Sequence, residues 1–184
     1  LFVCAAYQFV GHYYRPYQGA DIPGACIFDL VTIHPGDQAK RLIGNVVASL
    51  NSEWVTGLAG DEQVRNSFTH PSFTHSLITI VGFENHGGRT YLNTNHKSQI
   101  SMTKPFAKIT KGFGNNGEDG FEGAVYKNAI GSYFHGPLLP KNLHIADWLI
   151  AKALEMKYKK KIELKLLDDQ LENQAHDFVI SRGR

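Results

Sequence analysis

The chain opens on an apolar run that meets a cysteine followed by small residues. Residues 1–3 are apolar, Cys4 comes next, Ala5 and Ala6 follow, and Tyr7–Val10 have the apolar spacing of a short helix. A strand, a sharp turn of small residues and a helix form the arrangement that pushes a nucleophile out of the edge of a sheet. This opening therefore predicts an α/β fold with a reactive thiol at a sheet edge.

The composition fits one soluble globular domain and excludes several classes of function. The 184 residues carry 19 Lys+Arg and 17 Asp+Glu, so the formal net charge is 19 − 17 = +2, and 42% of them are hydrophobic. A dedicated nucleic-acid binder has a strongly basic patch or stripe, which this balance argues against. No run approaches the ~18 apolar residues of a spanning helix, so we expect no direct membrane insertion.

The two cysteines point to a reduced, cytoplasmic setting. Cys4 and Cys26 are too few for a disulfide framework, and a lone cysteine in a reduced compartment is a candidate nucleophile. No Cys-x-x-Cys or His-Glu-x-x-His spacing occurs, so no metal site is predicted. The chain starts at Leu1 rather than Met and lacks a signal-peptide pattern, which predicts that an N-terminal portion has been lost.

Most of the chain after the opening is predicted to be β structure. The apolar spacing of Tyr7–Val10 continues to Tyr13 and Tyr14, which predicts one short helix there. Amphipathic patterns predict helices over 145–157 and about 166–180. Segments of β-branched and aromatic residues between Gly, Pro and Asn clusters predict strands at 25–33, 41–50, 77–83 and 107–109. Residues 123–126 and 130–135 together predict one last strand that reaches His135.

Two polar segments and a basic one interrupt this pattern. Residues 51–76 are predicted to be an inserted loop or long hairpin, and residues 112–120 hold four glycines in nine positions, as a turn with positive φ requires. The lysine-rich residues 157–161 precede the last predicted helix. We therefore expect one domain over residues 1–157 and a basic, helical tail over residues 158–184.

A cysteine nucleophile needs a base, and His135 is the strongest candidate among nine histidines. It ends a predicted strand, and side chains at strand ends of an α/β sheet point into the cleft where ligands bind. His86 is interpreted as a turn cap. The other histidines are interpreted as solvated side chains in loops or on polar helix faces: His12, His34, His70, His75, His96, His144 and His176.

Several motifs along the chain together resemble one family. Residues 4–11 resemble the nucleophile turn of class I glutamine amidotransferases of the cobyric-acid-synthase type. Residues 82–90, 112–116 and 131–142 resemble the glutaminase subunits of lipid II isoglutaminyl synthase. The resemblance covers nearly the whole chain apart from residues 51–76 and the tail. It implies a flavodoxin-like three-layer α/β domain, here without the N-terminal part of its sheet.

The resemblance also implies a reaction and roles for individual residues. Glutamine is hydrolysed to glutamate, with Cys4 as nucleophile and His135 as base. Arg41 matches the position that holds the glutamine substrate, Gln8 matches a glutamine close to it, and the backbone N–H of Ala5 matches an oxyanion donor. The ammonia passes to a Mur-ligase-like partner in a heterodimer, which amidates D-glutamate of lipid II in peptidoglycan synthesis. No cofactor is expected in this subunit, since ATP and Mg²⁺ belong to the partner.

The sequence departs from the family at two places and leaves two alternatives open. The family usually has two glycines where this chain has Ala5 and Ala6, and Pro137 stands where many relatives carry a third catalytic glutamate. Either a Cys–His dyad suffices, or a carboxylate comes from elsewhere, including the partner. The alternatives are an amidotransferase of cobyrinate-type synthesis and a non-catalytic partner-binding scaffold. We expect a cytoplasmic protein that meets the inner face of the membrane only through its complex.

Overall fold

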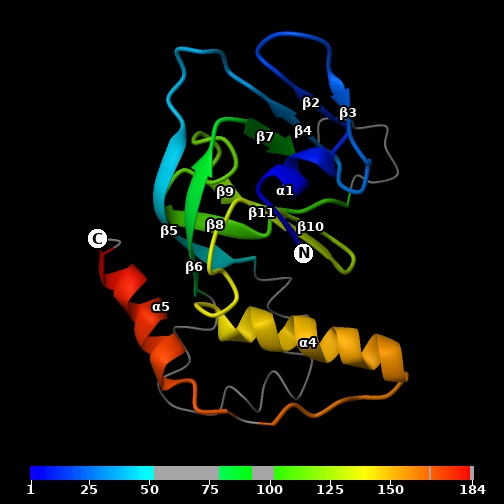
Figure 1. The fold of residues 1–184 in the computed structure, drawn as a ribbon, viewed down its shortest axis with the longest axis vertical. Helices are drawn as coiled ribbons and strands as arrows, with labels where there is room; N and C mark the ends of the chain where they lie inside the picture. The colour runs from blue at the N-terminus through cyan, green and yellow to red at the C-terminus, as the bar shows by residue number, and fades with distance from the viewer. Residues whose placement is uncertain (52–78, 93–101, 166, 183–184) are drawn as a thin grey trace.

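The computed structural model describes residues 1–51, 79–92, 102–165 and 167–182. Within them, a short helix follows the first strand, ten more strands come next and two helices come last, in an α/β arrangement of three small sheets (Figure 1). The expected α/β class is confirmed. The predicted insertion at 51–76 lies, except for Asn51, outside the described residues, and so do His70, His75 and His96.

The first sheet carries the start of the chain. Its order is β1 (Phe2–Val3), β11 (Ala129–Ser132) and β10 (Ala124–Tyr126). Strand β1 runs parallel to β11, with Val3 opposite Ser132, and β10 pairs antiparallel with β11. The helix α1 (Ala5–Phe9) follows β1 directly, as the opening of the sequence predicts.

The second sheet corrects one prediction. Its order is β3 (Ile22–Pro23), β2 (Tyr13–Arg15), β4 (Leu30–Ile33) and β7 (Arg89–Leu92). Tyr13 and Tyr14 were predicted to continue the first helix, and this prediction is wrong. Pro16 disfavours helical angles at Arg15, and Tyr14 pairs with Thr32 of β4.

The third sheet is antiparallel and lies against two helices. Its order is β6 (Thr79–His86), β5 (Leu42–Leu50), β8 (Ala107–Lys111) and β9 (Phe121–Glu122). Val46 belongs to a core cluster with Trp148 of α4 (Leu143–Tyr158), whereas Val47 packs with Val179 of α5 (Gln170–Arg182). Since successive side chains of a strand point to opposite faces, the two helices cover opposite faces of this sheet.

Two buried clusters meet just after β11. Tyr133 belongs to the cluster of Tyr7 and Phe28, and Phe134 belongs to the cluster of Val46 and Trp148. Both aromatic rings are fully buried. The segment leading to His135 is therefore fixed by packing on both sides.

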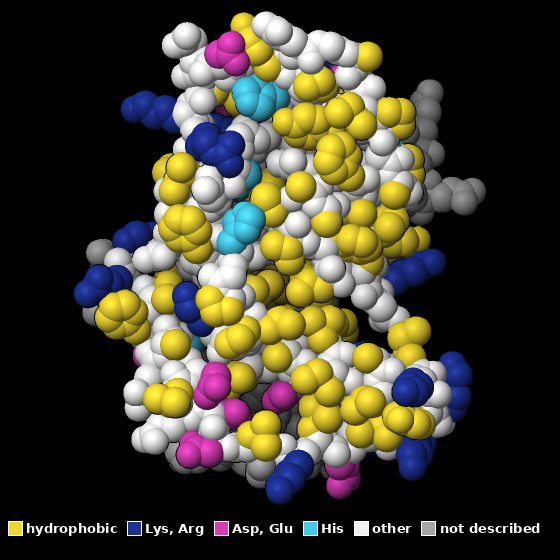
Figure 2. Space-filling model, viewed as in Figure 1, with side chains coloured by type: hydrophobic (Ala, Val, Ile, Leu, Met, Phe, Trp, Pro, Cys, Tyr) yellow, Lys and Arg dark blue, Asp and Glu magenta, His cyan; other side chains and the backbone are white. Residues whose placement is uncertain are grey.

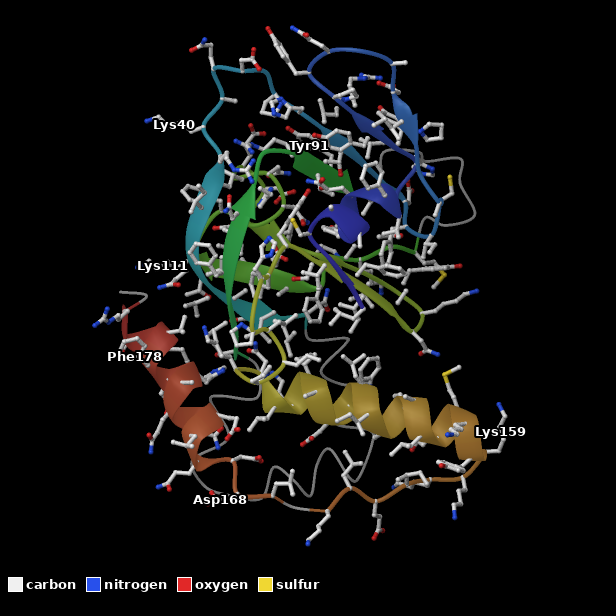
Figure 3. The ribbon with its side chains drawn as sticks, viewed as in Figure 1. Lys40, Tyr91, Lys111, Lys159, Asp168 and Phe178 are labelled. Atoms are coloured by element: carbon white, nitrogen blue, oxygen red, sulfur yellow. The ribbon has the colours of Figure 1, made fainter. Side chains whose placement is uncertain are left out.

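Several predicted boundaries shift. The strand predicted to reach His135 ends at Ser132, and the last helix begins at Gln170 rather than near residue 166. The predicted tail contacts the domain, because Val179 lies against β5 and β6 and Lys111 Nζ donates to Arg182 O at 3.2 Å. Figure 3 shows Lys111 and Phe178 on the same side of the molecule, next to α5.

Candidate active site

Cys4 occupies a tight turn between β1 and α1. Its backbone angles are φ 53° and ψ −113°, a region that residues with a side chain rarely adopt. Its N–H donates to Ser132 O at 2.9 Å, and its carbonyl accepts from Gln8 N at 3.1 Å. The turn leaves the thiol partly exposed and free of any disulfide. Ala5 and Ala6 are both exposed, so the turn accommodates their methyl groups.

The parallel pairing of β1 and β11 brings His135 to the same sheet edge as Cys4. Cys4 follows β1 by one residue, and His135 follows β11 by three. The N–H of His135 donates to Phe83 O at 2.7 Å, which ties it to β6. Its Nε2 is buried and has no hydrogen-bond partner among the described residues. The two residues predicted to carry the chemistry are therefore placed at one edge by short backbone connections.

The glycine turn between β6 and β7 lies between Arg41 and Gln8, the two predicted substrate-binding residues. A Cβ built on Gly87 would lie 3.5 Å from Arg41 Nη1, and one built on Gly88 would lie 2.8 Å from Gln8 Nε2. Arg41 donates through Nε to Asn85 Oδ1 at 2.9 Å and through Nη2 to Asn85 O at 3.0 Å. No role was assigned to Asn85 from sequence; in the structure it fixes the direction of the Arg41 guanidinium.

Arg89 links the same turn to the segment that precedes β5 in the chain. Its Nη1 donates to Gly87 O at 2.8 Å, and its Nη2 donates to Lys40 O at 2.6 Å. Figure 3 labels Lys40 and Tyr91, which lie at the end of the molecule away from α4. Arg89 thus binds backbone carbonyls rather than a ligand, and it had no role assigned from sequence.

A hydroxyl network lies beneath the glycine turn. Gln8 Nε2 donates to the hydroxyl of Tyr133 at 3.2 Å, and this hydroxyl lies 2.6 Å from Thr90 Oγ1. Thr90 Oγ1 in turn lies 2.8 Å from Thr32 Oγ1. The ring of His86 stacks on Tyr133 with centroids 3.5 Å apart. Sequence reasoning missed this network because its members are far apart in the chain; the one local signal is that Tyr133 stands two residues before the predicted base, His135.

Two buried carboxyl groups support the site, and sequence reasoning missed both. Glu122 Oε1 accepts from Ser132 Oγ at 2.8 Å and from Tyr133 N at 2.7 Å. Burial, opposed by these hydrogen bonds, raises the pKa of Glu122 to about 8. Glu84 accepts from the N–H groups of Phe113 and Gly114, which holds the glycine-rich loop. That loop has positive φ at all four glycines, as predicted: Gly112, Gly114, Gly117 and Gly120.

The histidines predicted to be solvated include two that are not. His144 Nε2 and His176 Nε2 are buried, and the two rings lie 6.4 Å apart where α4 meets α5. Burial, with His176 adding a smaller effect, lowers the pKa of His144 to about 3. His86 is buried as well, and its Nδ1 lies 2.8 Å from Gly88 O, which agrees with a turn cap. The prediction that His144 and His176 are solvated is wrong, because the packing of the helices against the third sheet encloses both side chains.

The surface away from the site combines apolar and basic side chains. Figure 2 shows hydrophobic side chains along α4 and lysines or arginines around its far end. Ile150, Met156 and Tyr158 are exposed there. None of the described helices has the length and apolar content that crossing a membrane requires. In the part of the chain that the structure describes, no three His, Cys, Asp or Glu side chains are grouped to hold a metal.

Comparison with known proteins gives one family and two kinds of relative. The profile of the CobB/CobQ-like glutamine amidotransferase domain matches residues 1–143. The subunit GatD of lipid II isoglutaminyl synthase (glutamine-hydrolyzing) from Staphylococcus aureus is 36% identical over 183 residues, covering 100% of this chain and 60% of that protein. The same subunit from Streptococcus pneumoniae is 33% identical, covering 93% of this chain and 54% of that protein.

A probable cobyric acid synthase from Methanocaldococcus jannaschii is 32% identical over 73% of this chain and 22% of that protein. The chain therefore spans little more than half the length of the two synthase subunits, and a smaller share of the cobyric acid synthase.

Proposed function

Because the chain belongs to the CobB/CobQ-like glutamine amidotransferase domain family, we propose that it carries a glutaminase site that converts L-glutamine to glutamate and ammonia. The observation that carries this proposal is the placement of Cys4 and His135 at one sheet edge, after two neighbouring parallel strands. A cysteine and a histidine at such an edge are the minimal groups for acyl transfer through a thioester.

The chemistry assigns one step to each group. The Cys4 thiol gives its proton to His135, and the thiolate attacks the amide carbon of glutamine. The Ala5 N–H donates to the oxyanion that forms, and the His135 imidazolium protonates the leaving nitrogen, which departs as ammonia. His135 then takes a proton from water, and the resulting hydroxide attacks the thioester carbon. The C–S bond breaks, glutamate leaves, and the His135 imidazolium returns its proton to the Cys4 sulfur.

Arg41 and Gln8 are proposed to hold the amino-acid end of the substrate. The guanidinium fork of Arg41 suits an α-carboxylate, which accepts two parallel hydrogen bonds. Gln8 directs its Nε2 to Tyr133, so its Oε1 is left to accept from the α-ammonium. The glycine turn between them provides the close backbone approach that a small substrate needs.

We further propose that the ammonia serves an ATP- and Mg²⁺-dependent, Mur-ligase-like subunit in a heterodimer. The names of the two lipid II isoglutaminyl synthase relatives, similar over 100% and 93% of this chain, support the D-glutamate of lipid II as the acceptor. The protein would then be cytoplasmic and would meet the inner face of the membrane through its complex. The flavodoxin-like three-layer arrangement belongs to the same proposal.

A second candidate is the amidotransferase domain of a cobyrinate-type amide synthase, with the same Cys–His chemistry and another acceptor. Its support is the 32% identity to the probable cobyric acid synthase, which covers only 73% of this chain. The third candidate is a non-catalytic scaffold, whose support is the Ala5–Ala6 pair.

The test is glutamate release from glutamine by the full-length protein co-expressed with its ligase partner. Cys4→Ala is expected to lower turnover at least ~10³-fold, since the nucleophile is lost. Cys26→Ala is the matched control, because Cys26 is also a free cysteine with positive φ, at 52°, and it should keep wild-type turnover. Glutamate release that persists in Cys4→Ala would overturn the catalytic assignment. No release from folded wild type would favour the scaffold.

A further inference from the structure

We propose that the Tyr133 hydroxyl is a positioning group for substrate recognition: it fixes the Gln8 carboxamide so that Gln8 Oε1 faces the α-ammonium of glutamine. This inference rests on the proposed glutaminase function. It adds a residue outside the predicted site, since Tyr133 is fully buried and its hydroxyl hydrogen-bonds Gln8 and Thr90.

The Gln8 amide lies with its Nε2 toward the Tyr133 hydroxyl. A tyrosine hydroxyl has one proton to donate and can accept as well. Tyr133 accepts from Gln8 Nε2 at 3.2 Å, and its oxygen lies 2.6 Å from Thr90 Oγ1, where either hydroxyl can be the donor. Thr90 continues the chain to Thr32 at 2.8 Å. Because the nitrogen end of the Gln8 amide is held by Tyr133, the oxygen end is the one that remains for a ligand.

The hydroxyl itself cannot shift, because the Tyr133 ring is held on its face and its edge. His86 stacks on it with an interplanar angle of 6°, and His86 Nδ1 is held at 2.8 Å from Gly88 O. Tyr7 meets the ring edge-on with centroids 5.2 Å apart. The backbone N–H of Tyr133 donates to Glu122 at 2.7 Å. Burial raises the pKa of the Tyr133 phenol, so the hydroxyl stays protonated.

The glycine turn leaves Gln8 little freedom on its other side. A Cβ on Gly88 would come within 2.8 Å of Gln8 Nε2, so the amide is enclosed between this backbone and Tyr133. Arg41 lies across the same turn, beside Gly87. One side chain of this pair suits the α-carboxylate and the other suits the α-ammonium, which is the pattern that distinguishes an amino acid from a simple amide.

The experiment compares two substrates in the full-length protein with its ligase partner. Glutamine has the α-ammonium, whereas 4-carbamoylbutyrate keeps the carboxylate and the amide but lacks the amino group. For Tyr133→Phe we expect the KM for glutamine to rise about tenfold, as for a lost hydrogen bond to a charged ligand, with kcat within about twofold. The kcat/KM for 4-carbamoylbutyrate should match that of wild type.

Two further variants separate positioning from general damage. Tyr7→Phe removes an equally buried hydroxyl that bonds Asn115 Oδ1 at 3.1 Å instead of Gln8, and its KM for glutamine should stay at the wild-type value. Adding Tyr133→Phe to Gln8→Ala should cause no further loss. If Tyr133→Phe does not fold, Thr90→Val should show the same glutamine-selective loss, and Thr90→Ser should restore the wild-type KM.

Three results would overturn the inference. They are an unchanged KM for glutamine in Tyr133→Phe, equal losses for both substrates, and additive losses in the double variant. Failure of the proposed function is a different result, because wild type itself would then release no glutamate.

Discussion

At the scale of single residues, Glu122 is the most informative buried group. Its carboxyl holds both Ser132 and Tyr133, and Ser132 O is the acceptor for the Cys4 N–H. A carboxyl with a pKa of about 8 is largely protonated at neutral pH, so it supports this segment as a neutral group. Its role is to fix backbone rather than to exchange protons with substrate.

Replacing Glu122 by glutamine should flatten the pH dependence of stability. Between the ordinary value of 4.5 and the folded value of about 8, the folded state holds one more proton than the unfolded state. Stability from this group is therefore present at low pH and is lost as the pH rises through that window, by at most about 1.4 kcal/mol per pH unit. We expect urea unfolding at pH 5, 6, 7 and 8 to show that the free energy of unfolding of Glu122→Gln rises relative to that of wild type at each pH step. Equal slopes for the two proteins would contradict the buried neutral carboxyl.

The sequence points to the two proposed reactive residues more readily than to the residues that support them. Cys4 and His135 stand at the ends of apolar strands, a pattern that can be recognised locally. Glu122 lies between Phe121 and Gly123 after a glycine-rich loop, and glutamate is almost never fully buried, so a surface position is the natural prediction. Only the folded contact with Ser132 and Tyr133 shows otherwise.

At the scale of elements, the turn between β6 and β7 depends on the size of two adjacent residues. Gly87 and Gly88 have different surroundings, although they are neighbours in one motif. Gly87 has ordinary contact distances to Arg41 and His34, whereas Gly88 is pressed against Thr32 of β4 and Gln8 of α1. The turn thus brings the second sheet and α1 together.

An added methyl group should therefore be harmful at one glycine and tolerated at the other. In Gly88→Ala the Cβ would lie 2.6 Å from Thr32 Cγ2, so we expect a loss of about 1–3 kcal/mol in the free energy of unfolding. In Gly87→Ala the nearest atoms lie 3.5 Å away, and stability should change by less than about 0.5 kcal/mol. Denaturant unfolding of both variants measures the difference. Equal losses would show that the turn, rather than the contact with β4, requires glycine.

Elements with strong local patterns agree with the prediction, and elements made by distant pairing do not. The predicted helix over 145–157 appears as Leu143–Tyr158, and the predicted strand over 41–50 appears as Leu42–Leu50. Tyr13 and Tyr14 were predicted as helix because their apolar spacing fits both structures. In the structure, β2 is a strand because it pairs with β4, whose partner residues lie 18 positions further along the chain.

At the scale of the whole molecule, the third sheet is enclosed by two helices from the C-terminal part of the chain. Alternation along β5 sends Val46 to the α4 side and Val47 to the α5 side. The α/β class follows from the sequence pattern. The division into three sheets, with β4 pairing β7 and β1 pairing β11, depends on contacts across more than 50 residues that no local pattern carries.

The α5 side of this enclosure should contribute to global stability through Val179. Val179→Ala removes apolar surface that packs on Val47 and Val81, so we expect the free energy of unfolding to fall by about 1–2 kcal/mol. Leu171→Ala on the same helix is the control. Because Leu171 is 75% exposed, we expect this substitution to change the free energy of unfolding by less than about 0.5 kcal/mol. Thermal unfolding in the full-length protein measures both. A Val179→Ala protein as stable as the control would mean that α5 lies on the sheet without supporting it.

The four residues from Ser132, the last residue of β11, to His135 each have a different role along one short stretch of backbone. Ser132 receives the Cys4 N–H, Tyr133 enters one cluster and holds Gln8, Phe134 enters the other cluster, and His135 joins β6. These duties alternate from one residue to the next. Inserting or deleting a single residue here would exchange all of them at once, whereas a conservative replacement disturbs one. Among related chains and in a mutant library, this stretch should therefore tolerate changes of side chain far better than any change of length.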